Sequence, residues 1–124
     1  MEIPKNLKYA KSHEWVSFDG NIATIGITDF AQDALTDIVF VTLPSVDDLI
    51  EIGTPFCEIE SVKSVSEVFS PVSGKIIAIN EELLTAPELI NEKPYDSWLI
   101  KVEFTEIESL IDASSYEAFC QSES

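Results

Sequence analysis

One lysine stands at the centre of a near-palindrome, and an accessible lysine amine is a group that can be acylated. The segment reads ESVKSVSE over residues 60–67, with its centre at the Lys63-Ser64 junction. Mirror-paired residues around a two-residue centre are typical of a tight hairpin. The expected cross-strand pairs are Val62 with Val65, Ser61 with Ser66 and Glu60 with Glu67. We therefore expect Lys63 at a rigid hairpin tip, exposed between small side chains.

The chemistry open to such a lysine is limited by its charge. An unperturbed lysine has a pKa of about 10.4, so it is protonated and a poor nucleophile at neutral pH. Neighbouring carboxylates would keep Lys63 protonated, which argues against catalysis by its own amine. Surface solubility is the ordinary role of an exposed lysine. Covalent attachment of a group is the more specific alternative, because it removes the charge and lengthens the projecting arm.

Short alternating segments separated by turn residues predict that most of the chain is β-strand. A hairpin is expected where Asp19-Gly20-Asn21 separates two alternating runs, and a short helix is expected from Thr28 or Asp29 onward. A loop with a helical turn is expected over 81–91. The expected strands cover residues 14–18, 22–27, 37–43, 54–60, 75–80 and 98–104. Phe30, Ala31, Ala34 and Leu35 should form the buried face of the helix.

After residue 104 the sequence pattern changes from the alternation of strands to the signals of helices. Two capping-box patterns, at 105–108 and 114–117, predict a short helix after each. The side chains expected to face inward are Ile107, Leu110 and Ile111 from the first helix, and Tyr116, Phe119 and Cys120 from the second. We expect one domain over 1–124, with 105–124 as a helical C-terminal extension packed on it.

Charge and composition exclude several classes of function. The chain of 124 residues carries a formal net charge of −16, which argues against binding to a phosphate backbone and favours partners with basic surfaces. Cys57 and Cys120 form no C-x-x-C pair, and Ser17 stands where a second histidine would complete H-E-x-x-H after His13. We expect no metal site and a hydrogen-bonded structural role for His13. No signal peptide, transit peptide or apolar run long enough to span a bilayer is visible, so we expect a cytoplasmic protein.

Motifs along almost the whole chain resemble those of the glycine cleavage system H proteins, a family of lipoyl carrier proteins. Their order and spacing also look like those of the family. The stretches that carry the resemblance are 7–9, 12–16, 25–32, 37–41, 60–64, 70–74, 87–91, 94–95 and 98–101.

The resemblance implies a fold, a cofactor and a function. The fold would be a lipoyl-type antiparallel β sandwich or flattened barrel with short helices, and Lys63 would carry covalently attached lipoic acid. The protein would be a non-catalytic, monomeric shuttle for the aminomethyl group of glycine. Its partners would be the pyridoxal-phosphate glycine decarboxylase (P protein), the folate-dependent aminomethyltransferase (T protein), dihydrolipoamide dehydrogenase (L protein) and a lipoate-attaching enzyme. Ser12, Glu14 and Glu67 match residues that line the family's cleft for the loaded arm.

Some positions depart from the family pattern. Glu67 stands where many members have Asp, and Thr36, Asp47 and Ser97 stand where glycine is usual, which suggests locally altered turns. These differences keep open an H-like lipoate relay without a complete glycine cleavage pathway. Val62 and Ser64 replace the methionines that usually flank a biotinylated lysine. A non-carrier interaction module or small enzyme, with an ordinary Lys63, is the remaining alternative.

Overall fold

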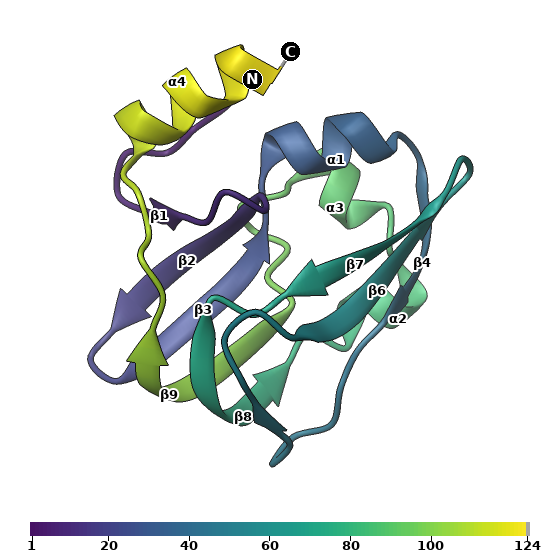
Figure 1. Ribbon diagram of the computed structural model, residues 1–124. Helices are drawn as coiled ribbons and strands as arrows, with labels where there is room; N and C mark the ends of the chain where they lie inside the picture. The colour runs from purple at the N-terminus through teal and green to yellow at the C-terminus, as the bar shows by residue number, and fades with distance from the viewer. Residues whose placement is uncertain (124) are drawn as a thin grey trace.

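Two antiparallel sheets face each other in the computed structural model, which describes residues 1–123 (Figure 1). The larger sheet has the order β1-β2-β3-β9-β8-β5, and its strands are β1 (Lys8–Tyr9), β2 (Glu14–Asp19), β3 (Ile22–Ile27), β9 (Ile100–Ile107), β8 (Val72–Ile79) and β5 (Leu49–Ile50). The smaller sheet has the order β4-β6-β7, with β4 (Ile38–Thr42), β6 (Pro55–Ser61) and β7 (Val65–Phe69). The predicted β sandwich with short helices is confirmed.

Alternation along the strands builds the core between the sheets. Ile25 of β3, Ile59 of β6 and Ile76 of β8 are fully buried in one apolar cluster. In β6 the neighbours of Ile59 behave oppositely, since Glu58 is exposed and Glu60 is half-buried. A period of two places successive side chains on opposite faces of a sheet, so the predicted half-buried strand is confirmed.

Residues 1–123 also contain four helices. They are α1 (Asp29–Leu35), α2 (Glu82–Thr85), α3 (Leu89–Glu92) and α4 (Ala113–Glu123). Thr28 caps α1, and its hydroxyl accepts a hydrogen bond from the Ala31 N–H at 3.2 Å. This is the usual way in which a side-chain oxygen satisfies a free N–H at a helix start, and it confirms the predicted helix.

The first capping-box pattern of the C-terminal segment does not start a helix. Strand β9 continues through Thr105 to Ile107, which pairs with Val72 of β8 and is 45% exposed. The prediction of a helix after Thr105 with Ile107 facing inward is therefore wrong, because pairing with β8 satisfies the backbone that the local pattern would have turned into a helix.

The second predicted helix exists as α4, but it begins two residues earlier than its pattern indicated, at Ala113 rather than after a Ser114 cap. The carboxylate of Asp112, rather than Ser114, accepts the hydrogen bond at the helix start, from the Ser115 N–H at 2.8 Å. Tyr116 and Cys120 are buried and Phe119 is partly buried, as predicted. Residue 124, the end of the predicted helical extension, lies outside the described residues.

Helix α4 lies beside the sandwich, next to the N-terminal segment (Figure 1). Its buried side chains belong to a second apolar cluster, together with Tyr9 and Trp15. Its Tyr116 ring stacks on Tyr9 of β1, with 4.6 Å between ring centroids and 10° between ring planes. The backbone segment leading to α4 is joined to the same strand, since Tyr9 and Ile111 exchange two hydrogen bonds. The chain end is thereby held against the start of the chain. Within residues 1–123 no helix is both long and apolar enough to cross a membrane.

Candidate functional site

The hairpin of β6 and β7 places Lys63 in its turn, but with a different register from the predicted one. The pairs are Glu60 with Val65, Ile59 with Ser66, and Glu58 with Glu67. The predicted mirror pairs are therefore wrong. The turn is centred on Val62-Lys63, because the Ser61 N–H donates to the Ser64 carbonyl at 2.8 Å.

A side chain explains this choice of register. The Ser61 hydroxyl oxygen accepts hydrogen bonds from the backbone N–H groups of Lys63 and Ser64, both at 3.2 Å. Serine commonly stabilises turns through such bonds to nearby backbone groups. The Val62 N–H also donates to the Asp37 carbonyl at 3.0 Å, which ties the turn to the residue before β4. The backbone under Lys63 is thus held from two sides.

The Lys63 side chain itself is free. Lys63 is exposed, and so are Val62 and Ser64 on either side of it. Within residues 1–123, Lys63 forms no ion pair with a carboxylate. The lysine that does form one is Lys75, whose Nζ lies 3.5 Å from the carboxylate of Asp47. Its amine is therefore presented to solvent on a fixed backbone, as predicted from the sequence.

A cleft lies beside this hairpin, between β7, α1 and the turn before β2. Its volume is about 170 Å³. It brings together all three residues that were predicted to line it: Ser12, Glu14 and Glu67. The other lining residues are His13, Ile27, Phe30, Ala31, Ala34, Leu35, Ile59, Ser66 and Val68.

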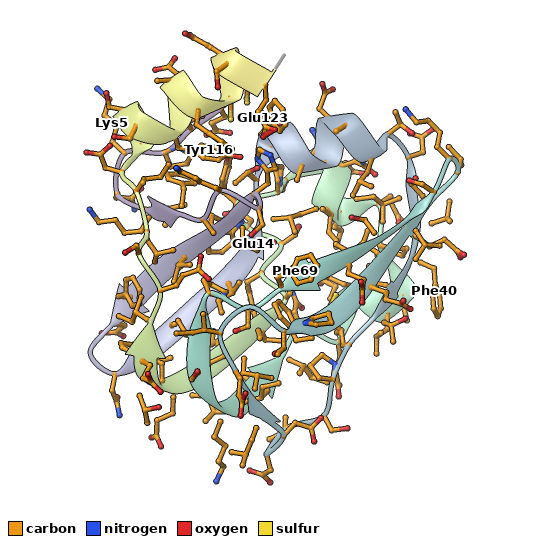
Figure 2. The ribbon with its side chains drawn as sticks, in the orientation of Figure 1. Lys5, Glu14, Phe40, Phe69, Tyr116 and Glu123 are labelled. Atoms are coloured by element: carbon orange, nitrogen blue, oxygen red, sulfur yellow. The ribbon has the colours of Figure 1, made fainter. Side chains whose placement is uncertain are left out.

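Glu14 is the buried charge of the cleft. It is 2% exposed, and Figure 2 shows it between the two sheets, near Phe69 of β7. Burial raises the pKa of its carboxyl group from 4.5 to about 7, although hydrogen bonds from the Ser12 hydroxyl and the Phe69 backbone N–H oppose the shift. Desolvation disfavours a charged carboxylate, so this group gains from any cation placed against it.

Glu67 occupies a different position in the same cleft. It is exposed, and its place in β7, opposite Glu58, puts it on the outer face of the small sheet with Val65. The neighbours Ser66 and Val68 are the residues that alternate toward the interior. Glu67 thus contributes to the rim of the cleft, whereas Glu14 lies at its base.

Sequence reasoning missed most of the apolar lining and one polar residue. The apolar face of α1 was predicted to be buried, but no residue of α1 is fully buried, and this face lines the cleft instead. His13 was predicted to be a hydrogen-bonded structural histidine, which is confirmed, but it also lines the cleft. The feature of the sequence that could have indicated this lining is the apolar face of the short helix α1.

Two of the glycine-replacing residues keep the backbone conformation that glycine favours. Thr36 has φ 64° and Asp47 has φ 79°, and Ser97 is not among the residues with positive φ. Positive φ is disfavoured for a β-branched residue such as threonine. These two turns therefore retain left-handed backbone without glycine.

The residues of the cleft and the tip fit a lipoyl arm. A lipoyl group attached to the lysine amine would add an aliphatic chain to the side chain. The cleft wall offers apolar side chains against which such a chain can pack, with one buried carboxylate at its base. Ser66 lies three residues from Lys63, which is about 10 Å along a strand. A lysine side chain extended by a lipoyl chain can cover that distance, so an arm attached at the tip can return to the cleft.

The fold and the site define a small β-sandwich carrier with a free lysine on a fixed hairpin beside a narrow cleft. The model of the family "Glycine cleavage H-protein" matches residues 7–123. Glycine cleavage system H proteins of Acidobacterium capsulatum and Bacillus cereus are 50% and 53% identical to the chain. The alignments cover 99% and 94% of this chain, and 98% and 94% of those proteins.

A solved structure is also similar. The crystal structure of a glycine cleavage system H protein from Mycobacterium marinum matches with a TM-score of 0.89 at 36% identity, covering 94% of this chain and 97% of that one. The chain therefore belongs to the glycine cleavage H-protein family, whose members are lipoyl carriers of the glycine cleavage system with the lipoyl group on a lysine. The alternative of a lipoate relay outside that system is not favoured.

Proposed function

We propose that Lys63 is the lipoylated residue and that this chain shuttles the aminomethyl group of glycine on the resulting arm. The observation that carries the proposal is the free amine of Lys63 on a hydrogen-bonded turn next to a cleft with a buried carboxylate. A lipoate-attaching enzyme needs a projecting amine without an ion pair. When attached, the lipoyl group supplies a disulfide that can be reduced and can accept a one-carbon unit.

The residues of the cleft then hold the far end of the arm. The Glu14 carboxylate accepts a hydrogen bond from a primary ammonium group, and charge-assisted bonds of this kind are among the stronger ones. The Ser12 hydroxyl orients Glu14, and Glu67 adds negative charge at the rim. The apolar side chains of α1 exclude water from the held group.

The chain performs no chemistry of its own in this proposal. Its partners are the glycine decarboxylase, the aminomethyltransferase, dihydrolipoamide dehydrogenase and the lipoate-attaching enzyme. A net charge of −16 steers the chain toward basic surfaces on such enzymes, an effect that salt weakens. We propose further that residues 1–124 work as one monomeric domain in the cytoplasm.

Mass analysis of the protein purified from its own host tests the attachment site. We expect the intact mass to exceed the sequence mass by one lipoyl group, and peptide mapping to place the group on Lys63. Unmodified Lys63 in cells supplied with lipoate would contradict the proposal. Reconstitution with purified decarboxylase and aminomethyltransferase then tests the shuttle, since a relay for lipoate alone would be lipoylated but would not be used by these enzymes.

A further inference from the structure

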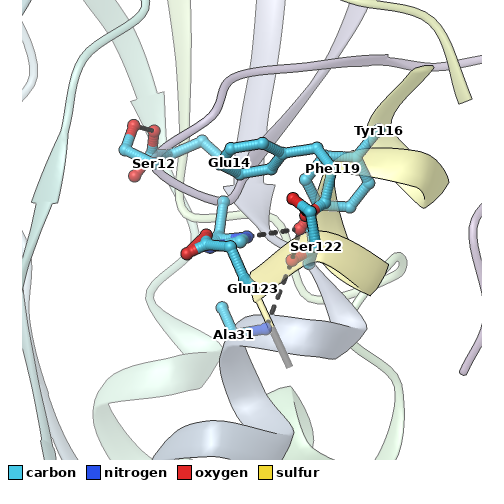
Figure 3. Close-up of polar contacts among 9 residues, drawn as sticks. Ser12, Glu14, Ala31, Tyr116, Phe119, Ser122 and Glu123 are labelled. Atoms are coloured by element: carbon cyan, nitrogen blue, oxygen red, sulfur yellow. Dashed lines mark hydrogen bonds and ion pairs between the residues drawn. The ribbon is translucent and has the colours of Figure 1, made fainter.

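The two walls of the cleft are connected to the C-terminal helix by a continuous series of polar contacts. The Tyr116 hydroxyl of α4 contacts Nδ1 of His13 at 2.7 Å and Oγ1 of Thr28 at 2.7 Å. Figure 3 shows Tyr116 and Glu123 of α4 in the same region as Ser12, Glu14 and Ala31. His13 lies between Ser12 and Glu14 in the sequence, and Thr28 caps α1. One hydroxyl group on α4 therefore contacts both the turn that carries the polar residues of the cleft and the start of its helical wall.

His13 is held in an unusual conformation by these contacts. Its φ is 76°, in the left-handed region that residues other than glycine seldom adopt. Its carbonyl accepts from the Thr28 N–H at 3.0 Å, and its ring stacks on Phe30 with 4.5 Å between centroids. Nε2 lies 3.1 Å from the carboxylate of Glu123, near the end of α4. The backbone on which Ser12 and Glu14 stand is thus fixed from α4 and from α1.

The contacts of Tyr116 lie in the interior, where a hydrogen bond matters most. Tyr116 and Thr28 are both fully buried. Removing one partner of a buried pair leaves the other unsatisfied, so the surrounding groups must move or admit water. The group next to this network that would detect water is Glu14, since its side chain is buried at the base of the cleft.

We infer that α4 acts as a clasp for the cleft, with Tyr116 and His13 as positioning residues that hold the turn of Ser12 and Glu14 against the start of α1. The content of the cleft rests on the proposed function, but the clasp itself does not. In a molecule without the clasp contact the two walls separate, water reaches Glu14, and an arm lodged in the cleft is less protected.

A purely structural role for α4 is the competing explanation, because the helix also covers the apolar cluster of Tyr9 and Cys120. A structural role predicts that loss of a Tyr116 contact lowers stability and leaves the cleft unchanged. Tyr9 offers a matched control, since it is equally buried in that cluster, stacks on Tyr116 and donates its hydroxyl to the Pro4 carbonyl instead. Tyr9→Phe removes one buried hydroxyl without touching His13 or Thr28.

The experiment compares Tyr116→Phe, Tyr9→Phe and the unchanged protein, all without lipoate, by NMR titration of the Glu14 carboxyl carbon. In the unchanged protein the pKa of Glu14 is raised to about 7, chiefly by burial, and Glu108 nearby also raises it. We expect Tyr116→Phe to lower this pKa by roughly one pH unit as water enters, and Tyr9→Phe to leave it unchanged. An unchanged Glu14 pKa in folded Tyr116→Phe, or an equal shift in both variants, would overturn the clasp.

Glu123→Gln provides a second variant, because the Glu123 side chain is 39% exposed in the last turn of α4, where a substitution of similar size disturbs packing little. It weakens the outer contact with His13, and we expect a smaller lowering of the Glu14 pKa in the same direction. If Tyr116→Phe does not fold, Glu123→Gln decides the question. An unchanged Glu14 pKa in Glu123→Gln would then overturn the clasp. All measurements use protein without lipoate, so their outcome is independent of whether Lys63 is the attachment site.

Discussion

The hairpin tip and the cleft are held in opposite ways. At the tip the backbone is fixed by the Ser61 hydroxyl while the Lys63 side chain is free. In the cleft the functional side chain is itself fixed, since Glu14 is buried and bonded to Ser12. A group that enzymes must reach needs a rigid base and an open end, whereas a group that must retain a small cation needs to be dry and pre-oriented.

The difference in burial also separates the two sites electrostatically. Lys63 is exposed in the turn, so an attaching enzyme can reach its amine and supply the base itself. Glu14 has a carboxyl pKa raised to about 7 by desolvation, so its charge becomes costly unless a cation arrives. In the proposed function, this protein therefore combines an accessible site for attachment at Lys63 with a buried, selective site for retention at Glu14.

The largest effect is expected from Lys63→Arg. The guanidinium keeps the positive charge but cannot be acylated in place of the amine, so lipoylation and shuttling should both be lost completely. Intact mass and reconstituted aminomethyl transfer measure the two losses. Lys75→Arg is the matched control, since Lys75 is paired with Asp47 and away from the turn. Residual lipoylation of Lys63→Arg would break the distinction between one attachment site and an ordinary lysine surface.

A pH-dependent effect is expected from Glu14→Gln. Because the folded pKa is above the ordinary 4.5, Glu14 contributes stability that is fully present below pH 4.5 and is lost as pH rises to about 7. That loss corresponds to about 3 kcal/mol of unfolding free energy. Urea unfolding from pH 4 to 8 should show a flatter profile for Glu14→Gln than for the unchanged protein. Parallel profiles would mean that Glu14 is not desolvated.

Most of the fold could be predicted because its signals are local and repeated. Alternation and turn residues located the hairpin of β2 and β3 and the strands of the small sheet, and a hydroxyl before an apolar helix face located α1. The wrong predictions concern segments whose local sequence allows two structures, where contacts with distant residues decide between them. Pairing with β8 kept residues 105–107 in a strand despite a capping box.

The candidate site could be predicted only in part, for the same reason. The palindrome correctly placed Lys63 in the turn of a hairpin. The symmetry of the residues does not determine which residues pair across the two strands, because the hydrogen bonds of the Ser61 side chain decide where the turn is centred. Ser12, Glu14 and Glu67 came from resemblance to a family, and they do line one cleft. The contribution of His13 could not be found from sequence, since its partner Tyr116 is 103 residues away.

A moderate effect is expected from Ser61→Ala, which tests whether the tip is rigid. The variant loses the acceptor of two backbone N–H groups, so we expect a loss of about 1 kcal/mol in unfolding free energy and faster amide exchange at Lys63 and Ser64. Ser64→Ala is the control, because the bonds of Ser64 in this turn are made by its backbone. Equal exchange in both variants would show that the turn does not depend on the Ser61 hydroxyl.

The smallest effect is expected from Glu67→Gln. Glu67 lies directly opposite Glu58 on an exposed face, and like charges in that position repel, so the variant should be more stable by less than about 1 kcal/mol. Its retention of an arm bearing an ammonium group should fall less than in Glu14→Gln, because a solvated carboxylate at the rim is screened by water. Rates of reaction of the loaded arm with solvent measure this retention in both variants. If the two losses are equal, the rim holds the cargo as firmly as the base of the cleft, and burial of Glu14 is not what makes the site selective.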